Sequence, residues 1–271
     1  HIGVSRHRQP QPRRGRHGAW AENQGGPAVW GNRKLKIALY DWPASPFCLK
    51  ARAILDYKRV PYTRIPVLGP AALKVRRRGG VGKFPALDID GRLVVDSTDI
   101  AYEIETLFPQ PPILPAVPRE RALCHALEDW ADEALYFIGL YFQWWDPAGA
   151  KMVPQAFGRS LFGRAAYIWF RRVVRRQLVG QGTARKSAAH VLADLGREID
   201  AVEQLVSPGP YLLGDRPYLC DFALLGQLVY LSRPPASRAA LNARPAIQAY
   251  LARMRALRGT PGETQEHRSR D

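Results

Sequence analysis

The segment from Ser45 to Cys48, Ser-Pro-Phe-Cys, holds a hydroxyl and a thiol three residues apart and is the part of the chain best suited to chemistry. It follows the apolar run from Leu35 to Tyr40, so the pattern predicts a strand that passes through a short loop into a helix. Serine is a favoured N-cap and proline a favoured first helical residue. Because a helix N-terminus offers free N–H groups and a partial positive charge, this corner would stabilise an anion, and a thiolate suits it best.

Hydrophobic spacing predicts the elements that must position this corner. We expect strands over 35–40 and 62–67, helices over 46–57 and 71–78, and a hairpin of 84–89 with 92–95. The hairpin is joined by Asp90-Gly91, a dipeptide favoured in primed turns. Asp96 and Ser97 then start an apolar-periodic helix. This order predicts a small α/β domain over residues 35–108.

The rest of the chain has a helical pattern. Proline-rich residues 109–118 predict a stiff linker, and residues 119–257 predict an all-helical domain. Within that domain we expect helices over 119–145, 191–205, 221–231 and 245–257. The basic run from Arg171 to Arg176 and the lone His125 and His190 fit solvated helix surfaces. Residues 1–34 predict a disordered basic tail and residues 258–271 a polar tail.

Composition excludes several classes of protein. With 271 residues and 46% hydrophobic content, the chain has room for one large or two ordinary domains and is not disordered throughout. Its three cysteines are widely spaced, which argues against a disulfide framework or zinc site and favours a cytoplasmic location. No apolar run is long enough to span a bilayer, so we expect no membrane partner. The Arg-rich start lacks the apolar core of a signal peptide, so we expect none. The chain begins with His1 instead of Met, which suggests a fragment, a processed chain or an upstream sequence of doubtful reality.

The net charge of +16 suggests a polyanionic partner, but much of it lies near the N-terminus. Residues 1–36 hold eight Lys and Arg residues against one Glu. We therefore expect non-specific contact of the tail with polyanions and no specific nucleic acid.

Four motifs in order carry a family resemblance. The segment from Ser45 to Arg52, SPFCLKAR, resembles the first-helix motif of serine- and cysteine-type cytosolic glutathione S-transferases. The other three are KFPAL at 83–87, the acidic-serine pair at 96–97, and GDRPYLCD at 214–221, which resembles the cap of the core helix of the second domain. The resemblance covers residues 35–257 and implies the glutathione S-transferase fold, a thioredoxin-like α/β N-terminal domain followed by an all-α C-terminal domain.

The resemblance also implies a site for glutathione as co-substrate, with no metal. In the family the proline that matches Pro85 is cis, and the residue before it, here Phe84, hydrogen-bonds the backbone of the cysteinyl unit. Asp96 and Ser97 match the pair that holds the γ-glutamyl group, the carboxylate taking the ammonium and the hydroxyl the carboxylate. Phe47 belongs to the same expected glutathione-binding set.

Three side chains compete for the catalytic role that the resemblance implies. Ser45 is the hydroxyl expected to hydrogen-bond the glutathione thiolate and lower its pKa, although a plain N-cap also explains it. Tyr40 is the rival, since tyrosine-type transferases place their hydroxyl near the end of the first strand; a packed aromatic explains Tyr40 as well. Cys48 occupies the resolving position of the glutaredoxin-like order, so we expect a bystander, with a redox-active thiol as the alternative.

We therefore expect a homodimeric glutathione S-transferase that activates the thiolate for attack on a small apolar electrophile. Aromatic residues crowd the helix expected over 119–145, and a pocket lined by them would suit a planar electrophile. Asp99 departs from the family pattern and adds negative charge near the expected glutathione carboxylate. The alternative is a non-catalytic interaction or adaptor module, because fold does not determine function.

Overall fold

The computed structural model describes residues 35–67, 70–79, 83–157 and 160–257. The tails expected over 1–34 and 258–271 lie outside these residues, as does Gly80, expected at the end of the second helix. The α/β part contains β1 (Ile37–Asp41), α1 (Pro46–Tyr57), β2 (Thr63–Pro66), α2 (Pro70–Arg77), β3 (Ala86–Ile89), β4 (Arg92–Val95) and α3 (Ser97–Leu107).

The helical part contains α4 (Pro118–Trp130), the π-helical segment η1 (Ala131–Leu135), α5 (Tyr136–Trp144), α6 (Pro147–Ala150), the 3-10 segment η2 (Val153–Phe157), α7 (Leu161–Gln181), the 3-10 segment η3 (Thr183–Arg185), α8 (Ala188–Val206), α9 (Leu219–Leu231), α10 (Pro235–Asn242) and α11 (Pro245–Ala256). None of the described helices is both long and apolar enough to cross a membrane.

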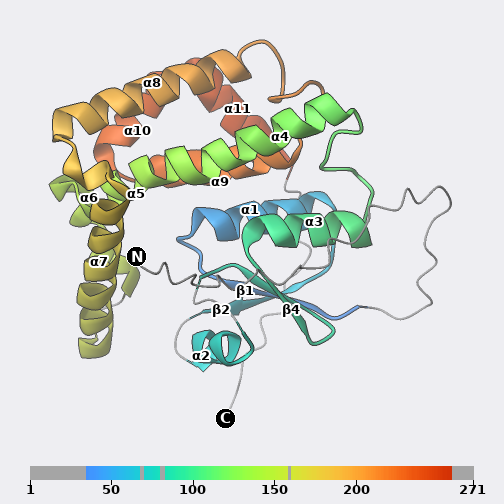
Figure 1. Ribbon diagram of the computed structural model, residues 1–271, viewed down its shortest axis with the longest axis horizontal. Helices are drawn as coiled ribbons and strands as arrows, with labels where there is room; N and C mark the ends of the chain where they lie inside the picture. Colours follow the sequence, from blue (N-terminus) through green and yellow to red (C-terminus); the bar gives the residue numbers. More distant parts are fainter. Residues whose placement is uncertain (1–34, 68–69, 80–82, 158–159, 258–271) are drawn as a thin grey trace, which may run out of the picture. The chain divides into compact units, whose positions relative to one another are not determined.

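The strands form a four-stranded mixed sheet in the order β2-β1-β3-β4. β1 pairs parallel with β2 and antiparallel with β3, and β3 pairs antiparallel with β4. At the β3–β4 turn, Asp90 and Gly91 have φ values of 49° and 91°, as a primed hairpin turn requires. Helices α1 and α3 lie on one face of the sheet and α2 on the other (Figure 1). This confirms the expected thioredoxin-like N-terminal domain followed by a helical one.

A continuous core joins the sheet to the helical domain through α1. Leu39 of β1, Ile54 of α1 and Leu228 of α9 are all fully buried in it. The α9 helix approaches the start of α1 so closely that a methyl group on Gly226 would lie 2.6 Å from the Pro46 carbonyl oxygen. Only glycine permits this approach, so the helical domain directly supports the first turn of α1.

The helix expected over 119–145 differs from the observed structure in its middle. A π-helical segment over Ala131–Leu135 separates α4 from α5. Such a segment widens the turn locally and often marks a functional site, and the spacing of apolar residues does not reveal it. Asp132 lies in this segment and points into the buried network described below.

The GDRPYLCD motif caps α9, as its resemblance implied. Asp221 Oδ2 accepts a hydrogen bond from the Tyr218 N–H at 2.9 Å, and Oδ1 accepts one from the Leu212 N–H at 3.0 Å. The Tyr250 hydroxyl donates to Oδ1 as well, at 2.9 Å. The buried carboxylate thus ties the start of α9 to the preceding loop and to α11, a folding role.

Candidate active site

The strand register brings the expected site segments to one end of the sheet. Tyr40 of β1 lies opposite Ala86 of β3, and Ala86 lies opposite Val95 of β4. The C-terminal ends of β1 and β4 therefore flank the N-terminal end of β3. The chain continues from these ends into the segments with the expected site residues, which are Ser45 and Phe47 after β1, Phe84 and Pro85 before β3, and Asp96 and Ser97 after β4.

Ser45 is the N-cap of α1. Its backbone is extended, and its buried Oγ accepts a hydrogen bond from the Cys48 N–H at 3.3 Å. This bond uses a lone pair of the hydroxyl oxygen and leaves the hydroxyl proton able to donate elsewhere. The capping role and the thiolate-binding role are therefore compatible in one side chain.

Cys48 is fully buried in the first turn of α1. Its Sγ accepts a hydrogen bond from the Trp42 N–H at 3.3 Å. Burial raises the pKa of the Cys48 thiol to about 12, so the group is protonated near neutral pH. A buried, protonated thiol is a poor nucleophile, which favours the bystander interpretation over the redox one.

Tyr40 points to the other face of the sheet. Its side chain is 1% exposed and packs in a small cluster with Val67, Val75 and Ala86, beneath α2. The neighbouring Leu39 instead packs in the large core with α1, as alternation along a strand requires. The geometry thus favours a packed aromatic at Tyr40 over an activating hydroxyl.

The Phe84–Pro85 peptide bond is cis, as the resemblance implied. Pro85 is buried, and Phe84 is half-buried against the cluster beneath α2. The Phe47 ring packs edge-on against Tyr136 of α5, with ring centroids 4.8 Å apart. Phe47 therefore contributes to the contact between the two domains, and its role toward glutathione stays a prediction.

Asp96 and Ser97 form the start of α3. Asp96 is the N-cap, and its Oδ1 accepts a hydrogen bond from the Thr98 N–H at 2.9 Å. Its φ of 80° is a conformation that non-glycine residues rarely adopt, and such residues cluster at ligand sites. Ser97 is buried, whereas Asp99 is exposed. Asp99 thus faces solvent.

Family models match both domains. The model of the glutathione S-transferase N-terminal domain matches residues 39–112, and that of the C-terminal domain matches residues 183–253. This chain belongs to the glutathione S-transferase superfamily. Its described α/β and helical parts are the two domains of that superfamily's fold.

Curated and structural relatives add detail to this assignment. Prostaglandin E synthase 2 of Danio rerio is 33% identical over 66 residues, which are 24% of this chain and 17% of that protein. Isoprene-epoxide–glutathione S-transferase of a Rhodococcus species is 25% identical over 190 residues, 64% of this chain and 77% of that enzyme. The chain therefore spans less than a fifth of the first relative and about three quarters of the second.

Among solved structures, the beta-etherase LigF of a Sphingobium species has a TM-score of 0.63 and 21% identity, covering 82% of this chain and 95% of that one. At this identity the match shows the shared fold.

A buried charge network lies beside the expected site. This network was missed in the sequence analysis. Lys50 of α1 is fully buried, and its Nζ lies 2.7 Å from Asp132 Oδ2 and 3.2 Å from Thr98 Oγ1, and contacts Glu128. Burial by itself lowers the pKa of Lys50, but the Asp132 and Glu128 carboxylates outweigh it and raise the pKa. Gln227 of α9 donates to Asp132 Oδ1 at 3.1 Å. The network joins α1 and the start of α3 to the helical domain.

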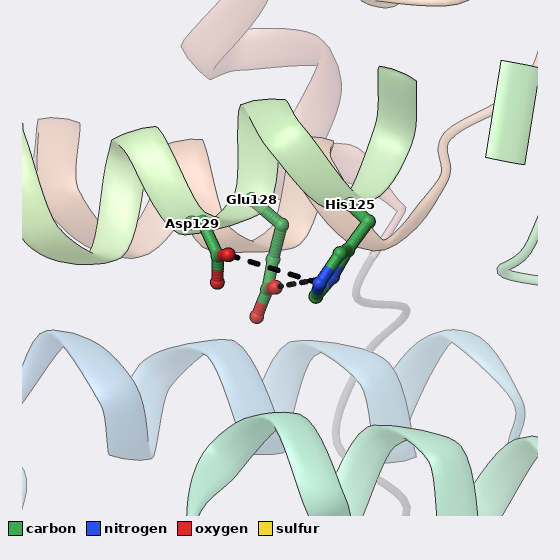
Figure 2. Close-up of side chains that lie close together, drawn as sticks. All are labelled: His125, Glu128 and Asp129. Carbon is green, nitrogen blue, oxygen red and sulfur yellow. Dashed lines mark ion pairs between the residues drawn. The ribbon is translucent and has the colours of Figure 1, made fainter. Parts of the chain in front are cut away.

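Glu128, itself buried, also lies beside the exposed His125 and Asp129 on α4 (Figure 2). His125 Nδ1 lies 3.6 Å from Glu128 Oε2, and Nε2 lies 3.7 Å from Asp129 Oδ2. Among the described residues, this is the one group of three side chains with the spacing of metal ligands. Because Glu128 already pairs with Lys50, a metal cation there would be repelled by the like charge of the ammonium group, and we assign the cluster to the ion network.

Arg233, at the end of α9, holds the loop before Ser45 and was also missed. Its Nη1 donates to the Ala44 carbonyl at 2.6 Å, and Nη2 donates to the Pro43 carbonyl at 3.5 Å. Burial lowers the pKa of the Arg233 guanidinium. An arginine after a buried helix gives no sequence signal for this contact, because its partners are main-chain oxygens far away in the chain.

An aromatic cluster packs against the same loop. Trp42 meets Phe170 of α7 edge-on, with centroids 5.3 Å apart, and Phe170 lies 5.1 Å from Trp144 of α5. Phe157 and Tyr167 complete the cluster. We expected such aromatics only from the helix over 119–145, whereas Phe157, Tyr167 and Phe170 come from the η2–α7 segment.

Proposed function

We propose that this chain is a glutathione S-transferase that activates the glutathione thiol at Ser45 for attack on an apolar electrophile. The observation that carries the proposal is the strand register, which brings the Ser45 helix start, the Phe84–Pro85 turn and the Asp96–Ser97 helix start to one end of the sheet. Two helix N-termini and two hydroxyls at one edge suit a ligand with a thiolate and carboxylates.

In the proposed reaction, bound glutathione loses its thiol proton to solvent, and Ser45 donates a hydrogen bond to the resulting thiolate. A sulfur lone pair then attacks an electrophilic carbon, forming a C–S bond while the bond from that carbon to its leaving group, or to an epoxide oxygen, breaks. The leaving atom takes the electron pair and is protonated from solvent. The positive end of α1 stabilises the thiolate before attack.

The aromatic cluster around Trp42 supports an apolar, planar second substrate. It packs against the loop that leads into Ser45, and its rings are apolar surface of the kind that lines pockets for such ligands. The names of two relatives concern an isoprene epoxide and a beta-ether, which are both electrophiles of modest size. We also propose a homodimer, as the resemblance implies, a cytoplasmic location, as the unpaired cysteines suggest, and domain boundaries at 35–108 and 119–257, as the sequence pattern suggests.

The decisive experiment is retention of the full chain on immobilised glutathione, followed by calorimetry at millimolar glutathione and a general electrophile assay. Binding with turnover supports the proposal. Absence of binding would remove both the enzyme and the site assignments. Binding without turnover against a broad electrophile panel would favour the alternative, a non-catalytic interaction module.

A further inference from the structure

Helix α7 has an outward face that mixes apolar side chains with uncompensated positive charge. Its 21 residues include five arginines and no Asp or Glu. Its inner face is held by Val174 and Leu178, which are 3% and 0% exposed, so the orientation of the helix is determined by packing. In Figure 1, α7 extends away from the other helices.

Exposed large hydrophobic side chains are concentrated on α7. Leu161 is 84% exposed and Trp169 is 66% exposed, the two largest values among the exposed large hydrophobic residues of the described chain. Ile168, Val173 and Val179 also belong to this group, so α7 carries five of its eleven members. Scattered single residues of this kind are ordinary, whereas several on one helix mark a contact surface.

The arginines of α7 lack acidic partners. Arg164, Arg172 and Arg176 are exposed, and none of the five arginines forms an ion pair with a carboxylate in the described ranges. Arg175 instead packs over the Trp145 ring, with its guanidinium carbon 3.9 Å from the ring centroid. The charge of this face is therefore available to an external anion.

We propose that the outward face of α7 binds the surface of an anionic lipid bilayer. Arginine beside tryptophan and branched aliphatic side chains is the composition of helices that lie in the bilayer interface, where the guanidinium groups meet phosphates and the apolar groups enter the acyl boundary. A nucleic acid would use the arginines and Trp169 but gains nothing from Leu161 or Ile168. A second copy docking the same face would bring like charges together.

This proposal does not depend on the transferase assignment. It departs from the expectation that Arg171 to Arg176 is only a solvated surface and that the chain has no membrane partner. It concerns peripheral binding, since none of the described helices can span a bilayer.

The test is co-sedimentation of the full chain with vesicles of phosphatidylcholine, with and without phosphatidylglycerol. We expect binding only to the anionic vesicles and weaker binding at high salt. Since each basic contact near an anionic surface contributes about fivefold, R172E with R176E should reduce the partition coefficient by at least about 25-fold. I168S with W169S should reduce it by at least about tenfold, because apolar burial is lost.

Matched controls separate α7 from the general positive charge. R238E with R255E makes the same charge change at two exposed arginines outside α7, and L192S removes a 51% exposed leucine of α8. Both should change the partition by less than about threefold. All variants keep residues 1–34, so any contribution of these residues cancels.

Three results would overturn the proposal. The first is absence of binding to anionic vesicles, and the second is an equal loss of binding in the control and α7 variants. The third is a W169S variant that has a lower mass than the wild type in analytical ultracentrifugation but binds vesicles equally well. In that case a second copy of the chain would cover this face in the wild type.

Discussion

Replacing Ser45 by alanine removes one oxygen atom that serves two purposes. The hydrogen bond that Ser45 Oγ accepts from the Cys48 N–H caps α1, and its loss costs about 1 kcal/mol of folding free energy. The lost donor to a bound thiolate is worth more, about 1.5–3 kcal/mol for a hydrogen bond to a charged group. Since one pKa unit corresponds to about 1.4 kcal/mol, S45A should raise the pKa of bound glutathione by about 1–2 units.

The assay is the ultraviolet absorbance of the thiolate of bound glutathione, followed against pH in the full chain. Below the wild-type pKa, each unit of increase lowers the thiolate fraction about tenfold, and turnover should fall in proportion. S45T retains both the acceptor and the donor and should restore the pKa. S45D retains the capping acceptor but adds a negative charge, so it should raise the pKa with a smaller loss of stability than S45A.

One result would refute the role of Ser45 as the activating group. If S45A binds glutathione with an unchanged thiol pKa and loses only about 1 kcal/mol of stability, Ser45 is a helix cap and no more. The activating group would then have to be sought elsewhere at this end of the sheet.

Other predictions follow from the same geometry. Y40F should leave the bound thiol pKa unchanged, because Tyr40 faces α2; an increase like that in S45A would contradict this. K50M should lower the free energy of unfolding in urea by about 3–5 kcal/mol, because it leaves buried carboxylates unpaired; a loss below about 1 kcal/mol would show that water already compensates them. R233M should lower it by about 1.5–3 kcal/mol through the bonds to the loop before Ser45, with partial recovery in R233K, whereas equal losses in both would point to packing alone. The Cys48 pKa of about 12 in the folded chain lies above its ordinary value of 9.0, so its contribution to stability is complete below pH 9.0 and is lost as pH rises toward 12; C48A should flatten that part of the pH profile, and an unchanged slope would argue against the raised pKa.

Local elements were predictable because their signals are local. The Asp90-Gly91 turn, the Ser45 cap and the strand alternation depend on residues a few positions apart, and each is found in the structure. The order of the motifs and periodic segments along the chain, including the Asp221 cap, was enough to predict both domains. The π-helical segment was missed, since a one-residue widening leaves the apolar pattern almost unchanged.

The sequence could offer Ser45, Tyr40 and Cys48 only as side chains of suitable chemistry near one another. Tertiary packing distinguishes their roles. Tyr40 lies on the far face of the sheet, and Cys48 is buried with a raised pKa, so its thiol stays protonated. Ser45 alone combines a buried cap with a hydroxyl proton able to donate.

Thus the sequence by itself determined the superfamily, the order of elements in the α/β domain and the helical character of the second domain, because these depend on local motifs and periodicity. It did not predict α7 or α10, and the glutathione-binding role of the named residues stays a prediction. Only the tertiary structure decided that Lys50 pairs with carboxylates of the helical domain, that Arg233 holds the Ser45 loop, and that α7 presents charge and apolar surface outward. These are contacts between residues distant in the chain. Burial, charge pairing and exposure depend on how whole elements pack, and no short stretch of sequence specifies that.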